Sequence, residues 1–361
     1  MEHTGRYYEP VAEALHEAGL YVSAMNPLLI KEYGANSLRK VKTDKADALK
    51  IARYALDNWA DLRDYTPMDT IRYDLKTLNR QFQLASKQRT ACSNNLIALL
   101  EQSFPSIHKC FNSPIRSDGT QKWVDFVHTF WHVDCVRKQS LNAFSERYRK
   151  WCKRHGYFFK QSNVEEVYSL AENAVVLVPK SDVTKVLVQQ AANQLTSISH
   201  SVETYRAEME RLASMLPEYP VVMEMYGVGK SFGPQLMAEI GDVRRFARKQ
   251  ALVAFAGIDP MPNQSGEKNV RSNKSSKRGS PYLRKTLFNV MGIYLKRTPQ
   301  DEPVFLFLDR KRSEGKPFYV YMTAASNKFL RRYYAKVRDY LATLEDLPPV
   351  DMDSTGLQGS D

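Results

Sequence analysis

Two heptad patterns constrain the fold of this 361-residue chain more than any other feature of its sequence. In each pattern apolar residues alternate at steps of three and four, which places them in a narrow stripe along one side of a helix. The first stripe runs from Ile71 to Leu99 with one break at Arg89, and the second runs from Val188 to Leu216 without a break. Because such a stripe must pack against another helix, the sequence predicts two long helices, paired either with each other or with those of a second copy of the chain.

The segment between the two stripes differs in composition. Residues 105–182 are rich in aromatic side chains and are interrupted by Pro105, Pro114 and Pro179. We interpret residues 65–216 as a helical, coiled-coil region and residues 105–182 as an insertion on an antiparallel helical hairpin.

Residues 1–64 predict part of an α/β domain. A helix is expected around Tyr8–Ala18, because an apolar periodicity stops at Gly19, followed by a short strand over Leu20–Met25 that ends at Asn26-Pro27. A second helix is expected from Thr43-Asp44 to about Asn58, since Thr and Asp are favoured N-cap residues. One strand and two helices do not close a sheet, so we expect the first strands of this domain to be missing.

The charge of the chain favours a polyanionic partner. Lys and Arg outnumber Asp and Glu by 52 to 40, a net charge of +12, which favours nucleic acid first and an anionic membrane surface second. No apolar run is long enough to span a membrane, and the first residues do not resemble a signal peptide. Four scattered cysteines without a Cys-x-x-Cys pair are typical of a reducing cytosol.

The last third of the chain predicts a basic helical domain over residues 217–344, after the boundary at Pro217–Pro220. Gly227 and Gly229 lie between two apolar helical runs, and Lys230 follows them. This pattern fits a helix-hairpin-helix turn that grips a phosphate backbone, and equally a plain glycine turn between core helices. Residues 345–361 contain acidic side chains and no basic one, which predicts a disordered tail.

A serine lies in the most basic segment of the chain. Ser265 is followed by seven Lys and Arg residues and one acid before position 286: Lys268, Arg271, Lys274, Lys277, Arg278, Arg284 and Lys285 against Glu267. The serine hydroxyl is a candidate nucleophile toward a phosphodiester, with the cations stabilising the extra negative charge. On composition alone, a turn serine in a phosphate-binding loop is the favoured interpretation.

Carboxylates and histidines supply further candidates. Asp44 and Asp47 lie three positions apart on one helix face, where with Glu2 they could hold magnesium; for so short a pattern, a helix cap and a solvated acid are the favoured interpretation. A zinc site is a weaker candidate, because its residues are interleaved with aromatic ones and core packing explains them better: His128, His132, Cys135, Cys152 and His155.

Several of these segments resemble, in order, the one-ten family of insertion-sequence transposases, which are bridge-RNA-guided DNA recombinases. The opening EHTGRY and KTDKADALKIA resemble the later part of that family's acidic, ribonuclease-H-like domain. The segment from Tyr219 to about Tyr340 resembles its serine-bearing transposase domain, through YGVGKSFGPQLMAEIGDVRRF, LVAFAGIDP, QSG and KRGSPYLRKTLF. The resemblance implies a mostly α protein with an incomplete α/β, RuvC-like N-terminal domain.

The resemblance also implies a mechanism. Glu2, Asp44 and Asp47 match the second, third and fourth members of an Asp-Glu-Asp-Asp set that binds Mg²⁺, and Ser265 matches the serine that is esterified to DNA. In that family the acidic site and the serine come from different subunits, so we expect a homo-oligomer (dimer or tetramer) with DNA and a guide RNA as partners, in the bacterial cytoplasm at the nucleoid. From their residue types, and not from the resemblance, we expect Gly227, Gly229 and Lys230 to contact the nucleic-acid backbone together with the cations after Ser265.

The sequence departs from the family pattern at its start. It begins at the second acidic residue, Glu2, without the strand that carries the first aspartate. We therefore expect an N-terminally truncated, impaired or inactive recombinase. Two alternatives stay open: a non-catalytic nucleic-acid-binding remnant, and a metal-dependent junction nuclease in which Ser265 only contacts phosphate.

Overall fold

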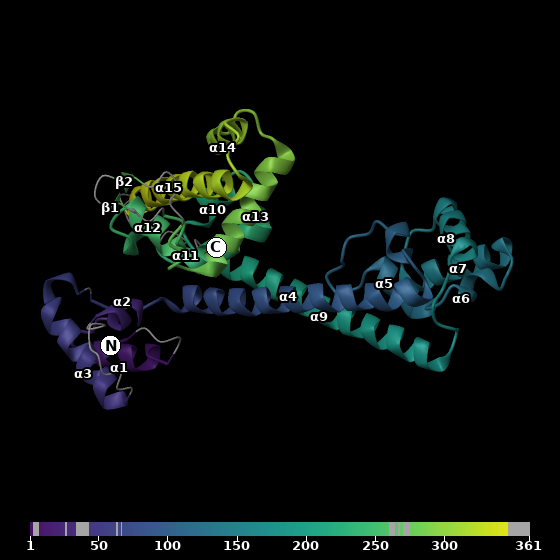
Figure 1. The fold of residues 1–361 in the computed structure, drawn as a ribbon, viewed down its shortest axis with the longest axis horizontal. Coiled ribbons are helices and arrows are strands. Elements are labelled where there is room, and N and C mark those ends of the chain that lie inside the picture. Colours follow the sequence, from purple (N-terminus) through teal and green to yellow (C-terminus); the bar gives the residue numbers. More distant parts are fainter. Residues whose placement is uncertain are drawn as a thin grey trace, which may run out of the picture. The chain divides into compact units, whose positions relative to one another are not determined.

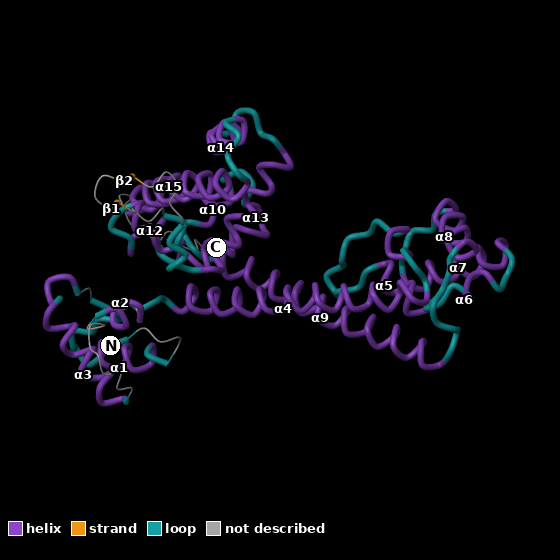
Figure 2. The backbone as a smooth tube through the Cα atoms, viewed as in Figure 1, coloured by secondary structure: helices purple, strands orange, loops and turns teal. Residues whose placement is uncertain are grey.

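The computed structural model describes residues 1–2, 7–25, 27–33, 43–62, 64–65, 67–259, 264–265, 268–269 and 275–345. In this part the chain is mostly helical, as predicted (Figure 2). It divides into two units, Met1–Asp69 and Thr70–Asp361, and each is described by itself.

The first unit contains three α-helices in its described part, α1 (Glu9–Glu17), α2 (Pro27–Glu32) and α3 (Asp44–Asp57), and the short 3₁₀ helix η1 (Trp59–Asp61). The predicted helices around Tyr8–Ala18 and from Asp44 onward are confirmed as α1 and α3. The Thr43 hydroxyl accepts a hydrogen bond from the Ala46 amide at 3.2 Å, which is the side-chain cap that the sequence predicts.

The strand predicted over Leu20–Met25 is not present as such. Among the described residues it makes a single parallel bridge, between Met25 and Glu2, and the Met1 ammonium donates to the Ser23 carbonyl at 2.7 Å. One bridge pairs too little backbone to make a strand ladder.

In the second unit, α4 (Thr70–Ser103) and α9 (Asp182–Ser214) pack against each other in antiparallel orientation (Figure 1). The apolar positions of both predicted stripes are buried or half-buried within one chain. Of the two pairings that the sequence allowed, the structure therefore has the pairing of the two helices with each other. Arg89, which breaks the first stripe, donates to Glu203 of α9 at 3.3 Å, so the break is occupied by a cross-helix ion pair.

Two separate apolar cores form on this helical pair. At one end, Leu96 and Leu100 of α4 and Leu195 of α9 pack with the segment between the helices. That segment forms a helical lobe whose elements are η2 (Ile107–Cys110), α5 (Lys122–Thr129), α6 (Asp134–Arg137), α7 (Leu141–His155) and α8 (Gln161–Asn173). The lobe returns close to where it began, because the Gln102 carbonyl accepts from the Leu177 amide at 3.0 Å and from the Val178 amide at 3.3 Å.

At the other end, Leu75 and Phe82 of α4 and Met209 of α9 pack with the C-terminal elements. These elements are α10 (Tyr219–Met223), α11 (Gly229–Ile240), η3 (Val243–Arg245), α12 (Lys249–Ala256), β1 (Gln264–Ser265), β2 (Lys268–Asn269), α13 (Pro281–Arg297), α14 (Pro303–Ser313) and α15 (Phe318–Glu345). Residues 346–361, most of the predicted tail, lie outside the described residues. Among the described helices, none combines the length and apolar character needed to cross a membrane.

We expect Leu96→Ala to lower the free energy of unfolding by about 2–5 kcal/mol, because it leaves a cavity in the core between the helical pair and the lobe. Leu84→Ala is the matched control on the same helix: Leu84 is 51% exposed whereas Leu96 is fully buried. Chemical denaturation followed by circular dichroism measures both, and equal losses would contradict this description of the core.

Candidate functional site

Helix α11 carries a buried carboxylate at the centre of the C-terminal elements. The Glu239 side chain accepts hydrogen bonds from the Asn79 amide nitrogen at 2.7 Å, from Arg80 Nη2 at 3.0 Å and from the Ser280 hydroxyl at 2.8 Å. Burying a carboxylate is costly unless its oxygens are bonded. Three donors from α4 and from the start of α13 supply those bonds, so Glu239 ties the three helices together.

A second polar cluster lies one helical turn before Glu239 on α11. The Gln235 side-chain oxygen accepts from Gln83 Nε2 at 2.8 Å and from the Thr286 hydroxyl at 3.3 Å. The Lys285 ammonium donates to the Gln83 side-chain oxygen at 2.7 Å. Gln83 lies on α4 and both Thr286 and Lys285 on α13, so this cluster joins the same three helices as Glu239.

This framework supports the loop that contains Ser265. At the base of the loop, the Ser276 amide donates to the Asp259 carbonyl at 3.0 Å and the Lys277 amide donates to the Gly257 carbonyl at 3.0 Å. The Ser280 amide donates to the Phe255 carbonyl at 2.8 Å, and the Ser280 hydroxyl reaches Glu239. The two ends of the loop are therefore held together and fastened to α11.

Two glycines make this close approach of the chain to itself possible. A Cβ on Gly279 would lie 1.9 Å from the Phe255 carbonyl oxygen, closer than any side chain can be. Gly257 has φ +66°, and a Cβ there would lie 2.7 Å from the Gly279 amide nitrogen. Both positions therefore require glycine for packing, and Gly257 requires it for its backbone conformation as well.

Within the loop, the described residues form a two-stranded antiparallel ladder. β1 and β2 pair with Ser265 opposite Lys268 and Gln264 opposite Asn269. The structure therefore describes the backbone of Ser265, as part of β1. The structure does not describe the side chains of Ser265 and Lys268. Arg271 and Lys274 lie wholly outside the described residues.

The other predicted phosphate contacts occupy different surroundings. Lys277 and Arg278 are exposed at the base of the loop. Lys230 is also exposed and lies 3.6 Å from a Glu210 carboxylate oxygen. Arg284 instead points into the fold: its Nη1 donates to the Ala256 carbonyl at 3.0 Å and to the Gly279 carbonyl at 2.9 Å, and burial lowers the pKa of its guanidinium. Its contacts in this structure fasten the loop base.

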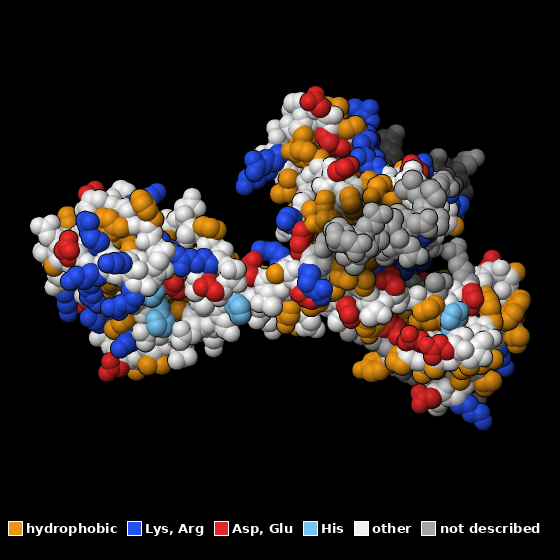
Figure 3. Space-filling model, turned by 180° about the vertical axis from the view of Figure 1, so that it is seen from behind, with side chains coloured by type: hydrophobic (Ala, Val, Ile, Leu, Met, Phe, Trp, Pro, Cys, Tyr) orange, Lys and Arg blue, Asp and Glu red, His pale blue; other side chains and the backbone are white. Residues whose placement is uncertain are grey.

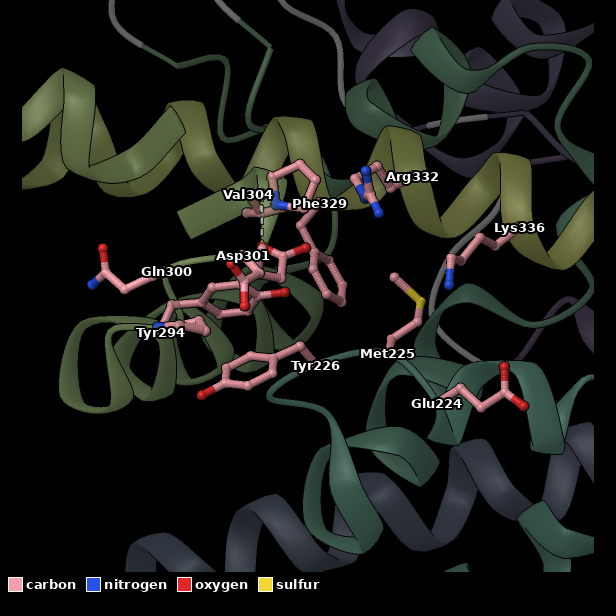
Figure 4. A pocket seen from close by; sticks show the side chains of 13 residues that line it. Glu224, Met225, Tyr226, Tyr294, Gln300, Asp301, Val304, Phe329, Arg332 and Lys336 are labelled. Carbon is pink, nitrogen blue, oxygen red and sulfur yellow. Dashed lines mark hydrogen bonds between the residues drawn. The ribbon is translucent and has the colours of Figure 1, made fainter. Parts of the chain in front are cut away.

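The glycine turn has the predicted location between α10 and α11. Gly227 has φ +74° and Gly229 has φ +49°, and a Cβ on Gly227 would lie 3.1 Å from the Tyr294 ring. A cavity of about 400 Å³ opens beside this turn (Figure 4). Arg332 and Lys336 line it from α15, but Glu224, Asp301 and Glu302 also line it. This mixture of charges does not favour a phosphate.

The acidic candidates lie in the first unit. Asp44 and Asp47 are exposed in the first turn of α3, and Glu2 is half-buried in its bridge with Met25. Among the described residues, no three His, Cys, Asp or Glu side chains are grouped closely enough to hold a metal ion. Glu2, Asp44 and Asp47 therefore do not fit a complete magnesium site in the described geometry.

The described residues contain no zinc site for the same reason, and the candidate zinc ligands have other roles. His132 is buried, with Nε2 3.1 Å from the Val178 carbonyl and Nδ1 accepting from the Asp134 amide at 3.1 Å. Cys135 and Cys152 are buried in the lobe core. His128 and His155 line a cavity of about 470 Å³ beside α9. Core packing accounts for three of the five.

Sequence reasoning missed Glu239 and its partners. The available signal was the pair Gln235 and Glu239, four positions apart in the otherwise apolar run Phe232–Ile240. Polar side chains at that spacing lie on one helix face, and in a buried helix they need partners from another element.

Two family models match the chain. One, described as "Transposase IS116/IS110/IS902 family", matches residues 219–303, and the other, the DEDD transposase model of IS110, matches residues 1–105. Among similar proteins, the "Insertion element IS900 uncharacterized 42 kDa protein" of Mycobacterium paratuberculosis is 26% identical over 311 residues, 83% of this chain and 72% of that protein.

Two further relatives carry names that describe DNA rearrangement. The transposase for insertion sequence element IS1111A of Coxiella burnetii is 30% identical over 120 residues, 33% of this chain and 32% of its own. The pilin gene-inverting protein of Moraxella bovis is 22% identical over 342 residues, 94% of this chain and 79% of its own.

We expect Gly279→Ala to displace the loop base, since its methyl group meets a backbone carbonyl that no rotamer change can move. A loss of about 1–3 kcal/mol in stability is the expected cost of overpacking, with faster proteolytic cleavage between Asp259 and Ser276. Gly292→Ala is the control: nothing lies within 4 Å of an added Cβ there, within α13, so it should gain about 0.5–1 kcal/mol. Equal melting temperatures of the two variants would contradict the close approach of Gly279 to the Phe255 carbonyl.

Proposed function

Because the chain belongs to the IS116/IS110/IS902 family of transposases, we propose that it cuts and rejoins DNA through a phosphoserine intermediate at Ser265. In this proposal the Ser265 oxygen attacks a DNA phosphorus, an oxygen–phosphorus bond of the strand breaks, and the released sugar hydroxyl takes up a proton. The serine–phosphate ester conserves the bond, so attack by another sugar hydroxyl can rejoin strands and free the serine.

The observation that carries this proposal is the construction of the loop base. Main-chain bonds join residues 255–259 to residues 276–280, and Ser280 continues into the buried carboxylate of Glu239. A loop whose ends are held in this way can present a residue between them in a defined region, which nucleophilic catalysis requires. Lys277 and Arg278, exposed at the same base, add positive charge to this part of the chain.

Magnesium is part of the proposal through the acidic residues Glu2, Asp44 and Asp47. A divalent ion would supply charge stabilisation at the phosphate oxygens. The described geometry leaves these carboxylates outside a complete site, so no step of the reaction is derived through the ion. The support is the match of residues 1–105 to the DEDD transposase model.

DNA is the partner that the family implies, and the net charge of +12 supports a polyanion. We further propose a structured guide RNA that selects the target, an oligomer of two or four chains, and action at the bacterial nucleoid in the cytoplasm. Both apolar stripes of α4 and α9 are buried within one chain, so an oligomer would have to use other surfaces.

The test of the mechanism is a covalent adduct. Incubated with labelled insertion-sequence DNA, guide RNA and magnesium, the chain should give a protein–DNA band that resists denaturing electrophoresis, and Ser265→Ala should abolish it. The band should be weak, because the sequence predicts an impaired enzyme. Ser275→Ala, in the same loop, is the control and should keep the band. An adduct that survives in Ser265→Ala excludes Ser265; cleavage without any adduct indicates a junction nuclease, and binding alone indicates a non-catalytic remnant.

The test of the acidic residues is metal binding itself. Isothermal titration with Mg²⁺ should show uptake by the wild-type chain and at least a tenfold weaker affinity in the double variant Asp44→Asn, Asp47→Asn, since two of the proposed oxygen ligands are then neutral. Asp61→Asn changes an exposed carboxylate of the same unit and should leave the affinity unchanged. Identical titrations of the double variant and the wild type would remove Asp44 and Asp47 from the proposal.

A further inference from the structure

Helix α7 of the lobe has one buried face and one strongly basic face. Phe144, Tyr148 and Trp151 are buried in the lobe core, whereas the side of the helix away from the core is exposed. From position 147 to position 160 the chain has six Lys and Arg and no Asp or Glu. The exposed cations among them are Arg147, Arg149, Lys150, Lys153, Arg154 and Lys160, which we call the α7 basic face. Figure 3 shows Lys and Arg side chains gathered on the lobe.

Little negative charge faces these cations. Arg149 is 3.8 Å from the exposed Glu146 carboxylate. For Lys150, Lys153 and Arg154, the described residues offer no carboxylate within ion-pair distance. Three neighbouring cations that lack an ion-pair partner among the described residues attract a polyanion, and each phosphate they neutralise would release counterions.

An exposed aromatic ring follows this helix in the sequence. Phe158 is 77% exposed, although its neighbours Tyr157 and Phe159 are packed in the lobe. The Tyr157 hydroxyl donates to Asp125 at 2.6 Å, and the Arg149 guanidinium lies 4.3 Å from the centre of the Phe159 ring. Both neighbours of Phe158 are therefore anchored in the lobe, whereas the Phe158 side chain itself is exposed.

The backbone around Phe158 is also held in place. The Lys122 ammonium, from α5, donates to the Phe158 carbonyl at 2.9 Å. Arg116 donates to the His155 carbonyl at 3.0 Å and to the Gly156 carbonyl at 2.7 Å, so the end of α7 is fixed. A single exposed apolar side chain is ordinary, but the backbone that carries this ring is hydrogen-bonded. In the sequence it follows cations that have no ion-pair partner among the described residues.

We propose that the α7 basic face and Phe158 bind an unpaired DNA strand, with the cations on its phosphates and the Phe158 ring stacked on one base. Cations with an adjacent exposed ring are the arrangement by which single strands are held, because every base has a π face that an unpaired strand leaves accessible. A duplex keeps its bases stacked on each other and leaves the ring without a partner. The choice of DNA rests on the proposed function, since exchange of DNA strands produces unpaired DNA.

The binding test uses the full chain carrying Ser265→Ala, so that its outcome is independent of covalent chemistry. A fluorescent 12-nucleotide DNA of mixed sequence is titrated and followed by anisotropy, with unlabelled duplex DNA, single-stranded RNA of the same sequence and heparin as competitors. The Phe158→Ala variant should bind about tenfold more weakly. Phe318→Ala is the matched control, because Phe318 is another exposed phenylalanine, 47% exposed, on α15; it should bind as its parent does.

A second variant tests the charges separately from the ring. Lys150→Gln, Lys153→Gln and Arg154→Gln together should reduce the slope of log affinity against log salt by about 2, since each lost phosphate contact on a single strand removes about 0.7. Unchanged melting temperatures would show that both variants fold. A DNA carrying 5-iodouracil should also photo-crosslink to the peptide that contains Phe158, a readout that DNA bound elsewhere on the chain does not supply.

Opposite outcomes overturn the proposal. Equal affinity of Phe158→Ala and Phe318→Ala, with no crosslink at Phe158, excludes base stacking. Heparin or duplex DNA that competes as well as the single strand assigns the face to charge alone, and RNA that competes at least tenfold better reassigns it to RNA. Every binding measurement uses Ser265→Ala and so does not depend on covalent chemistry. DNA can therefore bind at Phe158 even if no covalent adduct forms at Ser265, and an adduct can form even if Phe158 binds no DNA.

Discussion

The antiparallel contact between α4 and α9 is the interaction on which the rest of the second unit depends. Each apolar core uses one end of this pair: Leu75 and Met209 belong to the core of the C-terminal elements, and Leu96 and Leu195 to the core of the lobe. Neither the lobe nor the C-terminal elements could bury their apolar side chains without it. The pair is therefore both the core of the unit and the support for everything attached to it.

The buried carboxylate of Glu239 makes this support specific as well as stable. Apolar contacts tolerate small shifts, but a carboxylate with three short bonds from two other helices does not, because any rotation of α11 would leave a buried charge without a donor. Through Ser280, that requirement extends to the base of the loop around Ser265. The position of the proposed nucleophile is thus linked to side chains of α4 that lie far from it in sequence.

Local sequence signals predicted local structure well. The heptad stripes, the Thr43 cap of α3 and the glycine turn before α11 are each encoded within a few neighbouring residues, and the structure has all three. The strand over Leu20–Met25 was wrong, because a strand depends on a partner that lies elsewhere in the chain. The Glu239 network could not be predicted for the same reason: Asn79 and Glu239 are 160 positions apart.

The same difference between local signals and tertiary contacts applies to the predicted site residues. Arg284 was expected to contact phosphate because it follows a row of cations, yet its guanidinium bonds to the carbonyls of Ala256 and Gly279, which only the tertiary structure brings near. His132 and the buried cysteines similarly satisfy the lobe core. The roles of Ser265, Asp44 and Asp47 came from the order of motifs along the chain, and those assignments stay predictions.

The lobe leaves and rejoins the helical pair at neighbouring points, where Gln102 bonds to Leu177 and Val178. A segment with such closely spaced ends can be shortened, enlarged or exchanged in a gene without altering the helices on either side. The length and content of the lobe can thus change at this junction while the helical pair and the C-terminal elements stay the same.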